Sequence, residues 1–258
     1  MADSIKKSDF VQSLEKGLKV ISIFNAQNDE LTLTEVAKQV ELTRANARRI
    51  LLTLLHLGYV TSADGKYFRL TPKVLTLGYA YLSSLSFREL AEPFLNELAK
   101  TVNESCSLSV LDGHDIVYVA RVQTSRIMTI SLGLGTRLPA YATSMGRVLL
   151  SGLSQEEVEK YASETSFEPF TNYTITDPQA FLERINLVRQ RGWALADQEL
   201  EIGVRSIACP IKDKNGKTIA ALNISGHASR VSRDELIEKY LPELRKTVAQ
   251  IEAALYKR

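Results

Sequence analysis

The chain has 258 residues, 45% of them hydrophobic, and carries 32 Lys and Arg against 30 Asp and Glu, a formal net charge of +2. This composition is typical of soluble globular proteins with one or two domains. No apolar stretch reaches the roughly 18 residues that span a bilayer, and the first residues lack the apolar region of a signal peptide, so we expect a cytoplasmic protein with no membrane partner.

The few cysteines and histidines argue against a metal centre. Cys106 and Cys209 show no CxxC spacing, and the histidines stand far apart at positions 56, 114 and 227. A structural zinc site needs about four such ligands. We therefore expect two buried thiols and neither a metal nor another cofactor.

Positive charge is concentrated in one segment of this nearly neutral chain. Residues 43–73 hold six Lys and Arg and a single acidic residue, Asp64, which gives a local charge of +5. Such an excess indicates a nucleic-acid-binding module, although the solvated basic face of a helix would give the same charge. The neighbouring elements decide between these two interpretations.

Three short helices are predicted before residue 60. The first follows Ser13 as its N-cap, the second follows Thr34, and the third follows Thr43 and ends at Gly58. Only a few residues separate the second helix from the third, which is the spacing of a helix-turn-helix unit.

The third predicted helix has an apolar side and a polar side. Ala47, Ile50, Leu51 and Leu54 share about one third of its circumference, and we expect this side to face the other two helices. The polar residues gather in the first two turns, where a recognition helix meets base edges in the major groove. The residues of this helix predicted to contact DNA are Thr43, Arg44, Ala45, Asn46, Arg48 and Arg49.

A hairpin is predicted directly after the third helix. Tyr59–Thr61 and Lys66–Leu70 are rich in strand-forming residues, and an Asp-Gly pair lies between them. A hairpin in this position is a wing, whose Lys66 and Arg69 would contact phosphate. The helices, the wing and the local charge together predict a winged helix-turn-helix that binds double-stranded operator DNA.

A linker helix is predicted at residues 72–85, where Pro72 precedes apolar residues on more than one side. A linker covered by a second subunit gives this pattern, and a core helix of the next domain gives it as well. We favour the linker, because DNA readers of this type act as dimers. The predicted organisation is therefore a DNA-binding domain at 1–71, the linker at 72–85 and a larger domain at 86–258.

The larger domain mixes helices and strands in an α+β order. Strands are expected at 105–122, 126–132, 193–213 and 217–227, with tight turns at the Asp-Gly and Asn-Gly pairs. Helices are expected at 87–104, after Thr143 or Ser144, and after the caps Ser154, Asp177 and Ser232. These elements predict a mainly antiparallel sheet with helices on both sides.

No catalytic motif accounts for the larger domain. The chain lacks GxSxG, GxxxxGK[ST] and HExxH, and it has no GxGxxG after a strand. The run Asp197, Glu199 and Glu201 is a candidate carboxylate pair for acid–base chemistry, but a solvated loop is the more common origin of such a run. We therefore do not expect an enzyme.

A ligand pocket accounts for the larger domain better. A helix begins near Ser144 directly after a loop with Gly and Pro, and the unpaired N–H groups of such a start suit a carboxylate. Polar residues on the strands could orient a small molecule beside it, although each alone is also ordinary in a strand. Those residues are Arg205, Ser206, Asn223 and Ser225. The helix start, helped by Arg205, would meet the negative charge of an acid.

Several long motifs resemble the IclR-type bacterial transcription regulators over nearly the whole chain. They are "FVQSLEKGLKVI", "LTLTEVAKQVELTRANARRILLTLLHLGYV", "LPAYATSMGRVLL", "DQELEIGVRSIACPI" and "AALNISGH". Within this family, "ESCSLSVLDGHDIVYVARV" and "FRLTPKVLTLGYAYLSSL" are most similar to the regulators of the protocatechuate, β-ketoadipate and 4-hydroxybenzoate pathways.

The resemblance implies a winged helix-turn-helix, a linker helix and a GAF-like effector-binding domain, assembled as a homodimer or tetramer. The effector contacts that it implies are Ser144, Met145, Gly146, Ser206, Asn223 and Ser225. Members that bind glyoxylate-like acids have Cys at Ser206, Ser at Asn223 and Asp at or beside Ala196, which argues against glyoxylate here.

The resemblance leaves three acids open as the effector: protocatechuate, β-ketoadipate and 4-hydroxybenzoate. An unrelated ligand is an alternative within the family, and an enzyme acting on a small acid is an alternative outside it. RNA polymerase would be a further partner of such a regulator. Whether the protein activates or represses depends on the operator position, which the sequence does not contain.

Overall fold

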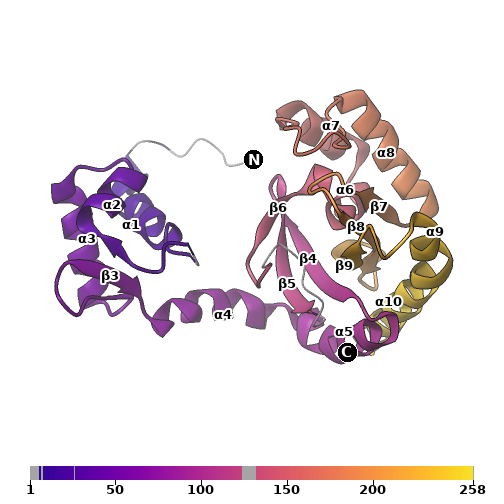
Figure 1. Cartoon of the computed structure of the whole chain (residues 1–258), viewed down its shortest axis with the longest axis horizontal. Coiled ribbons are helices and arrows are strands. Elements are labelled where there is room, and N and C mark those ends of the chain that lie inside the picture. Colours follow the sequence, from indigo (N-terminus) through magenta and orange to yellow (C-terminus); the bar gives the residue numbers. More distant parts are fainter. Residues whose placement is uncertain (1–5, 7, 26, 124–131, 258) are drawn as a thin grey trace. The chain divides into compact units, whose positions relative to one another are not determined.

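The computed structural model describes residues 6, 8–25, 27–123 and 132–257. The chain forms two compact units, one ending at Ser83 and the other beginning at Ser84, and each has its own hydrophobic core (Figure 1). Within the described ranges, none of the helices has both the length and the apolar character that a membrane crossing needs.

Before Pro72, the first unit contains the three predicted helices and the predicted hairpin, and a short strand that was not predicted adds to the hairpin. The helices are α1 (Gln12–Ser22), α2 (Leu33–Gln39) and α3 (Arg44–His56). The strands are β1 (Leu31–Thr32), β2 (Val60–Thr61) and β3 (Tyr67–Leu70), and they pair in the order β1-β3-β2. The apolar sides of these elements bury one core that includes Val20, Val36, Ala47, Leu51 and Phe68.

Two of the three predicted N-caps in this unit are wrong. Helix α1 begins at Gln12 with Val11 at its N-cap and no side-chain cap, so Ser13 lies inside the helix. Helix α2 is capped by Thr32 and not by Thr34, because Glu35 returns its carboxylate to the Thr32 N–H at 2.7 Å and completes a capping box. The Thr43 cap of α3 is confirmed by its bond from the Asn46 N–H.

The turn residues of the helix-turn-helix and the wing have the expected geometry. Gly58, directly after α3, has φ +76°, and Gly65 in the hairpin has φ +71°. The Asp64 carboxylate accepts the N–H groups of Lys66 and Tyr67 at 2.9 and 3.0 Å, which lowers its pKa. This turn therefore fixes where the exposed Lys66 of the wing lies.

The segment after β3 consists of a short 3-10 turn, η1 (Pro72–Val74), and helix α4 (Leu75–Ser84). Several large apolar side chains of α4 are exposed, with Leu75 at 73% and Tyr79 at 70%. No residue of α4 is buried in the single chain. The expected apolar surface on more than one side is therefore present and uncovered.

The second unit is built around one six-stranded sheet. Its strands are β4 (Ser105–Asp112), β5 (Asp115–Val122), β6 (Arg137–Pro139), β7 (Ala194–Asp197), β8 (Val204–Lys212) and β9 (Thr218–His227). They lie in the order β6-β5-β4-β9-β8-β7, and every neighbouring pair is antiparallel. The strand expected at 126–132 falls almost entirely outside the described residues.

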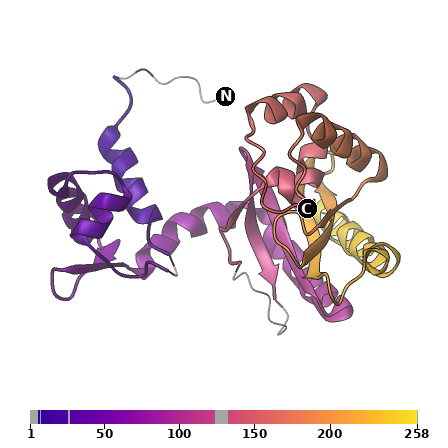
Figure 2. The same ribbon diagram turned by 45° about the horizontal axis from the view of Figure 1, so that its top comes forward.

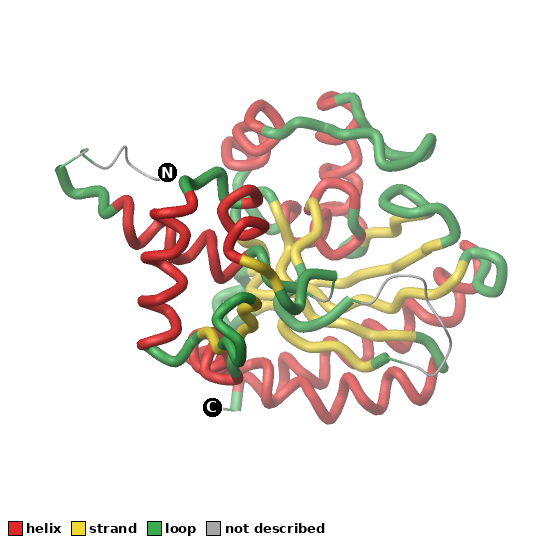
Figure 3. Tube along the Cα trace, turned by 60° about the vertical axis from the view of Figure 1, so that its left-hand side comes forward, coloured by secondary structure: helices red, strands yellow, loops and turns green. Residues whose placement is uncertain are grey.

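Helices cover both faces of this sheet. They are α5 (Ser86–Val102), α6 (Ser144–Ser151), α7 (Gln155–Glu164), α8 (Pro178–Arg191), α9 (Arg233–Glu235) and α10 (Leu241–Tyr256), with short turns η2 (Ala140–Ala142) and η3 (Leu236–Tyr240). Helix α5 runs along β4 and β5 (Figure 2), and it packs with α10 on one face. Helices α6 and α8 lie on the other face (Figures 1 and 3).

Successive side chains of a strand point to opposite faces of this sheet. On β8, Ser206 reaches α6, since its hydroxyl lies 2.8 Å from that of Ser144. Cys209, three residues further along, interacts with Arg245 of α10 on the opposite face. Both cysteines are free and buried, as predicted, and burial raises their pKa values, for Cys209 to about 12. The predicted caps Thr143, Ser154, Asp177 and Ser232 are also confirmed.

Candidate functional site

A cavity lies between the α6 face of the sheet and the loop that joins β7 to β8. It contains about 610 Å³ of space not filled by atoms, including its opening to solvent. Its lining consists of Tyr118, Leu132, Leu138, Ala142, Thr143, Ser144, Met145, Ala196, Glu199, Leu200, Glu201, Val204, Ser206, Asn223 and Ser225.

Five of the residues selected from the sequence line this cavity. Ser144 and Met145 come from the start of α6, Ser206 from β8, and Asn223 and Ser225 from β9. The register explains their meeting, because Ser206 lies directly opposite Ser225 and their side chains share one face of the sheet. Three segments that are separate in the sequence therefore contribute to one surface, and its role in effector binding stays a prediction.

Gly146, which was also selected, does not line the cavity. A Cβ atom at this position would overlap the backbone carbonyl of Ala140, so a side chain has no room there. Its N–H donates to the Thr143 hydroxyl at 3.0 Å as part of the α6 cap. The glycine therefore allows α6 to begin close against η2, which in turn positions Ser144 and Met145.

Arg205 requires a correction, because it does not line the cavity either. Adjacent residues of a strand point to opposite faces, so the inward position of Ser206 sends Arg205 away. Its guanidinium donates to both carboxylate oxygens of Asp197, at 2.7 and 3.1 Å, and to the Val231 carbonyl at 2.6 Å. This arginine is committed to the fold and is not free to meet a ligand.

The acidic run Asp197, Glu199 and Glu201 is not the solvated loop that we expected. Asp197 pairs with Arg205, while Glu199 and Glu201 line the cavity. Glu199 is buried and accepts two hydrogen bonds from the fully buried Arg147 of α6, one of them at 2.6 Å. The structure therefore assigns a wall of the cavity to this run, and sequence spacing gave no signal of it.

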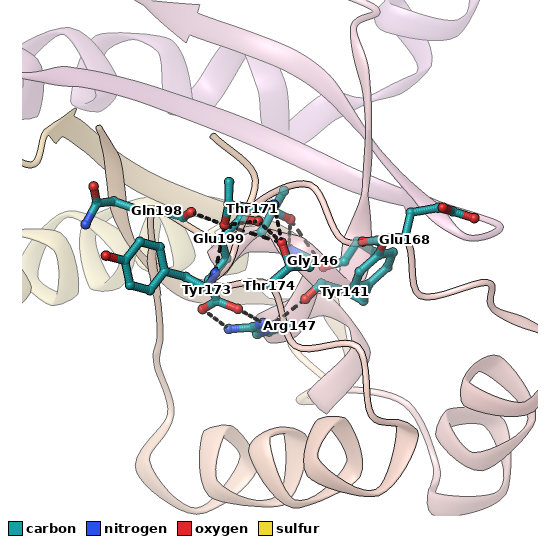
Figure 4. A network of polar contacts seen from close by, with 11 residues as sticks. Tyr141, Gly146, Arg147, Glu168, Thr171, Tyr173, Thr174, Gln198 and Glu199 are labelled. Carbon is teal, nitrogen blue, oxygen red and sulfur yellow. Dashed lines mark hydrogen bonds and ion pairs between the residues drawn. The ribbon is translucent and has the colours of Figure 1, made fainter. Parts of the chain in front are cut away.

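Figure 4 shows how this wall is fixed in place. The Arg147 Nε also donates to the Tyr141 carbonyl at 2.9 Å, so one guanidinium joins η2 to the β7–β8 loop. The hydroxyl of Thr171 donates to the Gln198 carbonyl at 2.7 Å, and that of Thr174 donates to the Glu199 carbonyl at 2.5 Å. The loop is thus held from two sides, and its cavity-facing residues are preorganised.

The candidate nucleic-acid surface lies on the first unit. Thr43, Arg44, Ala45, Arg48 and Arg49 are exposed, and Asn46 is half-buried in a groove beside α1. In the wing, Lys66 lies 5.0 Å from the centroid of the Tyr67 ring, and Arg69 forms an ion pair with Glu30 at 2.9 Å. Arg69 therefore has a partner already, while the three arginines of α3 have no ion pair with any described residue.

Two family models together match most of this chain. The IclR helix-turn-helix domain matches residues 13–64, and the bacterial transcriptional regulator IclR C-terminal domain matches residues 79–253.

Among curated proteins, the chain is 44% identical over 237 residues to the Pca regulon regulatory protein of Pseudomonas putida, covering 92% of this chain and 81% of that one. It is 38% identical over 255 residues to the p-hydroxybenzoate hydroxylase transcriptional activator of Acinetobacter baylyi, covering 97% and 94%. Among solved structures, the PobR inducer-binding domain from Acinetobacter, a double mutant in complex with 3-hydroxybenzoic acid, is 40% identical with a TM-score of 0.61 and covers 64% of this chain and 96% of that one.

Proposed function

Because the chain belongs to the IclR family of bacterial transcription regulators, we propose that its first unit binds operator DNA and that the cavity of its second unit binds a small aromatic acid. The resemblance found in the sequence is thereby confirmed, and the chain is a DNA-binding transcription regulator. The cavity lining is the observation that carries the second half of the proposal.

Three relatives support an aromatic acid as the effector. Their names refer to the Pca regulon, to p-hydroxybenzoate hydroxylase and to 3-hydroxybenzoic acid. We infer that this chain controls genes of the protocatechuate and β-ketoadipate route or of 4-hydroxybenzoate use. The cavity agrees with such a ligand, because it combines apolar side chains such as Tyr118, Leu132 and Leu138 with a few polar groups.

Calorimetry on the full chain tests this proposal. We expect protocatechuate, 4-hydroxybenzoate or β-ketoadipate to bind, and glyoxylate to bind poorly. Ser225→Leu should abolish binding by filling the cavity, while Ser163→Leu, on the exposed side of α7, should leave it unchanged. If Ser225→Leu binds as tightly as the wild type, the pocket is misplaced. If no aromatic or dicarboxylic acid binds the wild type, the pathway assignment fails and the DNA-binding assignment stands.

We further propose that the cavity binds its ligand without converting it. The relatives are regulators, and the described lining contains no Cys, His or Lys. Incubating the protein with 4-hydroxybenzoate and following the acid by chromatography should return it unchanged.

Finally, we propose that the chain assembles as a homodimer or a tetramer through α4. The exposed Leu75 and Tyr79 give this helix an apolar surface that a second copy would bury. Sedimentation of the wild type should show an oligomer, and Leu75→Glu combined with Tyr79→Glu should shift it toward monomer.

A further inference from the structure

Buried polar atoms without a hydrogen-bond partner occur in the cavity and in the groove beside it. Six such side-chain atoms occur among the described residues. Four of them belong to only three residues: Nε and Nη2 of Arg121, Oε2 of Glu201 and Oδ1 of Asn223. Such atoms are costly in a folded protein, so their presence there points to a missing partner.

Glu201 and Asn223 line the cavity, and both unpartnered atoms are hydrogen-bond acceptors. Among the described residues, no Lys or Arg forms an ion pair with Glu201, whereas Arg147 pairs with Glu199. A negatively charged ligand group placed against Glu201 would be repelled, whereas a hydroxyl donor would satisfy its free oxygen. The β7–β8 side of the cavity therefore favours a ligand hydroxyl over a ligand carboxylate.

Arg121 is on β5, several strands away from the β7–β8 loop in the order of the sheet. Three observations place it next to the cavity. Its Nη1 donates to the Ser107 hydroxyl at 3.2 Å, and Ser107 lies opposite the cavity-lining Asn223 in the β4–β9 register. Its Cζ lies 5.9 Å from the centroid of the Tyr118 ring, which lines the cavity. Leu132 belongs both to the cavity lining and to the adjoining groove that Arg121 lines.

Among the described residues, the Arg121 guanidinium lacks a counter-charge as well as hydrogen-bond acceptors for two of its nitrogens. It has no ion pair with any described residue, and its burial lowers its pKa. A carboxylate placed against its free Nε and Nη2 would accept two parallel hydrogen bonds, which is the preferred geometry of an Arg–carboxylate pair. The sequence alone does not mark this residue, because Arg121 is an ordinary member of an alternating strand pattern.

We propose that the cavity and the adjoining groove of Arg121 together orient a hydroxylated aromatic acid, with the carboxylate on the Arg121 guanidinium and the ring hydroxyl on the Glu201 carboxylate. The sheet order β5-β4-β9-β8-β7 separates the two groups, and the apolar residues between them cover the ring. The inference rests on the proposed function and adds the direction in which the ligand lies in the site. A binding site with the Arg121 guanidinium at one end and the Glu201 carboxylate at the other would select against unsubstituted acids and against diacids.

A crossed set of ligands and variants tests the orientation. Calorimetry would compare 4-hydroxybenzoate with benzoate on the wild type, Arg121→Met and Glu201→Leu. We expect Arg121→Met to weaken both ligands by roughly tenfold or more, because both have the carboxylate. Glu201→Leu should weaken 4-hydroxybenzoate by about tenfold and leave benzoate unchanged or improved, since benzoate has no hydroxyl. Each variant is thus the control for the other, and Glu159→Gln on the exposed side of α7 should change neither ligand.

Thermal melting of the unliganded variants shows whether they fold. Arg121→Met removes a buried charge without a partner, so the unliganded protein should melt no lower than the wild type. Arg121→Lys, which keeps the charge and loses the fork of donors, should recover part of the affinity for both acids.

The outcomes separate the two proposals. If the wild type binds no aromatic or dicarboxylic acid, protocatechuate and β-ketoadipate included, the proposed effector class is in error. If the wild type binds 4-hydroxybenzoate and Arg121→Met leaves benzoate affinity intact, or Glu201→Leu weakens both ligands equally, only the orientation is wrong.

Discussion

A single buried ion pair, Arg147 with Glu199, joins α6 to the loop that forms one wall of the cavity. Arg147 donates two hydrogen bonds to the Glu199 carboxylate, and its side chain is completely buried. Burying charges costs solvation free energy, so the pair contributes little net stability compared with apolar residues of similar size. The main effect of the pair is to hold the β7–β8 loop in one position relative to the start of α6.

Removing one member of this pair should be far more harmful than removing both. Glu199→Gln leaves a buried guanidinium without a counter-charge, and we expect a loss of roughly 3–5 kcal/mol in unfolding free energy. The double variant Arg147→Met with Glu199→Leu should lose less than either single change. Urea denaturation measures all three. Glu164→Gln, which breaks the exposed pair with Lys160, should change stability by less than about 1 kcal/mol. Additive losses in the double variant would contradict this account.

Gly146 illustrates a close backbone approach at the residue scale. In Gly146→Ala the new methyl group would meet the Ala140 carbonyl, so α6 must move. We expect a loss of roughly 1–3 kcal/mol and weaker effector binding. The matched change Gly17→Ala lies within α1 in open space, and it should stabilise its helix by up to about 1 kcal/mol. Thermal melts of the two variants should therefore shift in opposite directions.

The residues of the cavity were only partly predictable. Ser206 and Ser225 were found because small polar residues on strands stand out from apolar neighbours. Arg205 was misassigned because alternation along the strand was not applied to it. The Arg147–Glu199 pair joins residues 52 positions apart, and no local pattern encodes such a pairing. Glu201 stands out in the sequence as part of an acidic run, whereas its unpartnered oxygen and the unpartnered donors of Arg121 depend on contacts between distant segments.

At the scale of elements, α3 concentrates the unpaired positive charge of the first unit. We propose that Arg48 and Arg49 contact operator DNA, and we expect Ala substitutions of either to weaken binding. A lost phosphate contact should lower the salt slope of affinity by about 1 for all sequences. A lost contact to guanine should cost roughly 1–3 kcal/mol and relax specificity. Gel shifts over a salt series distinguish these cases, with the exposed Lys214→Ala of the second unit as control. Unchanged affinity in both arginine variants would remove them from the interface.

Element types were more predictable than element boundaries. The helices, the wing and the Asn-Gly turn between β8 and β9 follow from periodicity and from residues with restricted backbone preferences. Helix caps were harder to predict, because Ser13 and Thr34 have neighbours that can also occupy the N-cap position. At α2 the decisive partner was Glu35, three residues after Thr32, which fits the capping-box spacing.

At the scale of the whole molecule, buried acidic groups set an upper limit on pH stability. Burial raises the pKa of Cys209, Tyr118 and Tyr161 to about 12 each, from ordinary values of 9.0 and 10.0. Above these ordinary values the unfolded chain loses protons that the folded chain retains. The unfolding free energy is therefore unaffected by these three groups below about pH 9, and it falls as the pH rises from there toward 12. Urea midpoints measured from pH 7 to 11 should fall beyond pH 9, and a constant midpoint would contradict the prediction.

The division into two units predicts that they can be separated. A fragment from Ser86 should fold and bind the effector without operator affinity, because it keeps its sheet, its helices and the cavity. A fragment ending at Thr71 should bind DNA weakly, since it loses the avidity of two linked half-sites. Circular dichroism and calorimetry check the first fragment, and gel shifts check the second. An unfolded fragment from Ser86 would overturn this division.

The central strand pair of the sheet has a consequence for the synthesis of the protein. Strand β4 needs β9 as a neighbour, and their paired residues Ser107 and Asn223 are more than a hundred positions apart. The DNA-binding unit is complete in sequence long before β9 leaves the ribosome, at a translation rate of roughly 5–20 residues per second. For several seconds a nascent chain would therefore have a folded DNA reader and an unfinished sensor. In that interval the chain could meet operator DNA before it can respond to an acid.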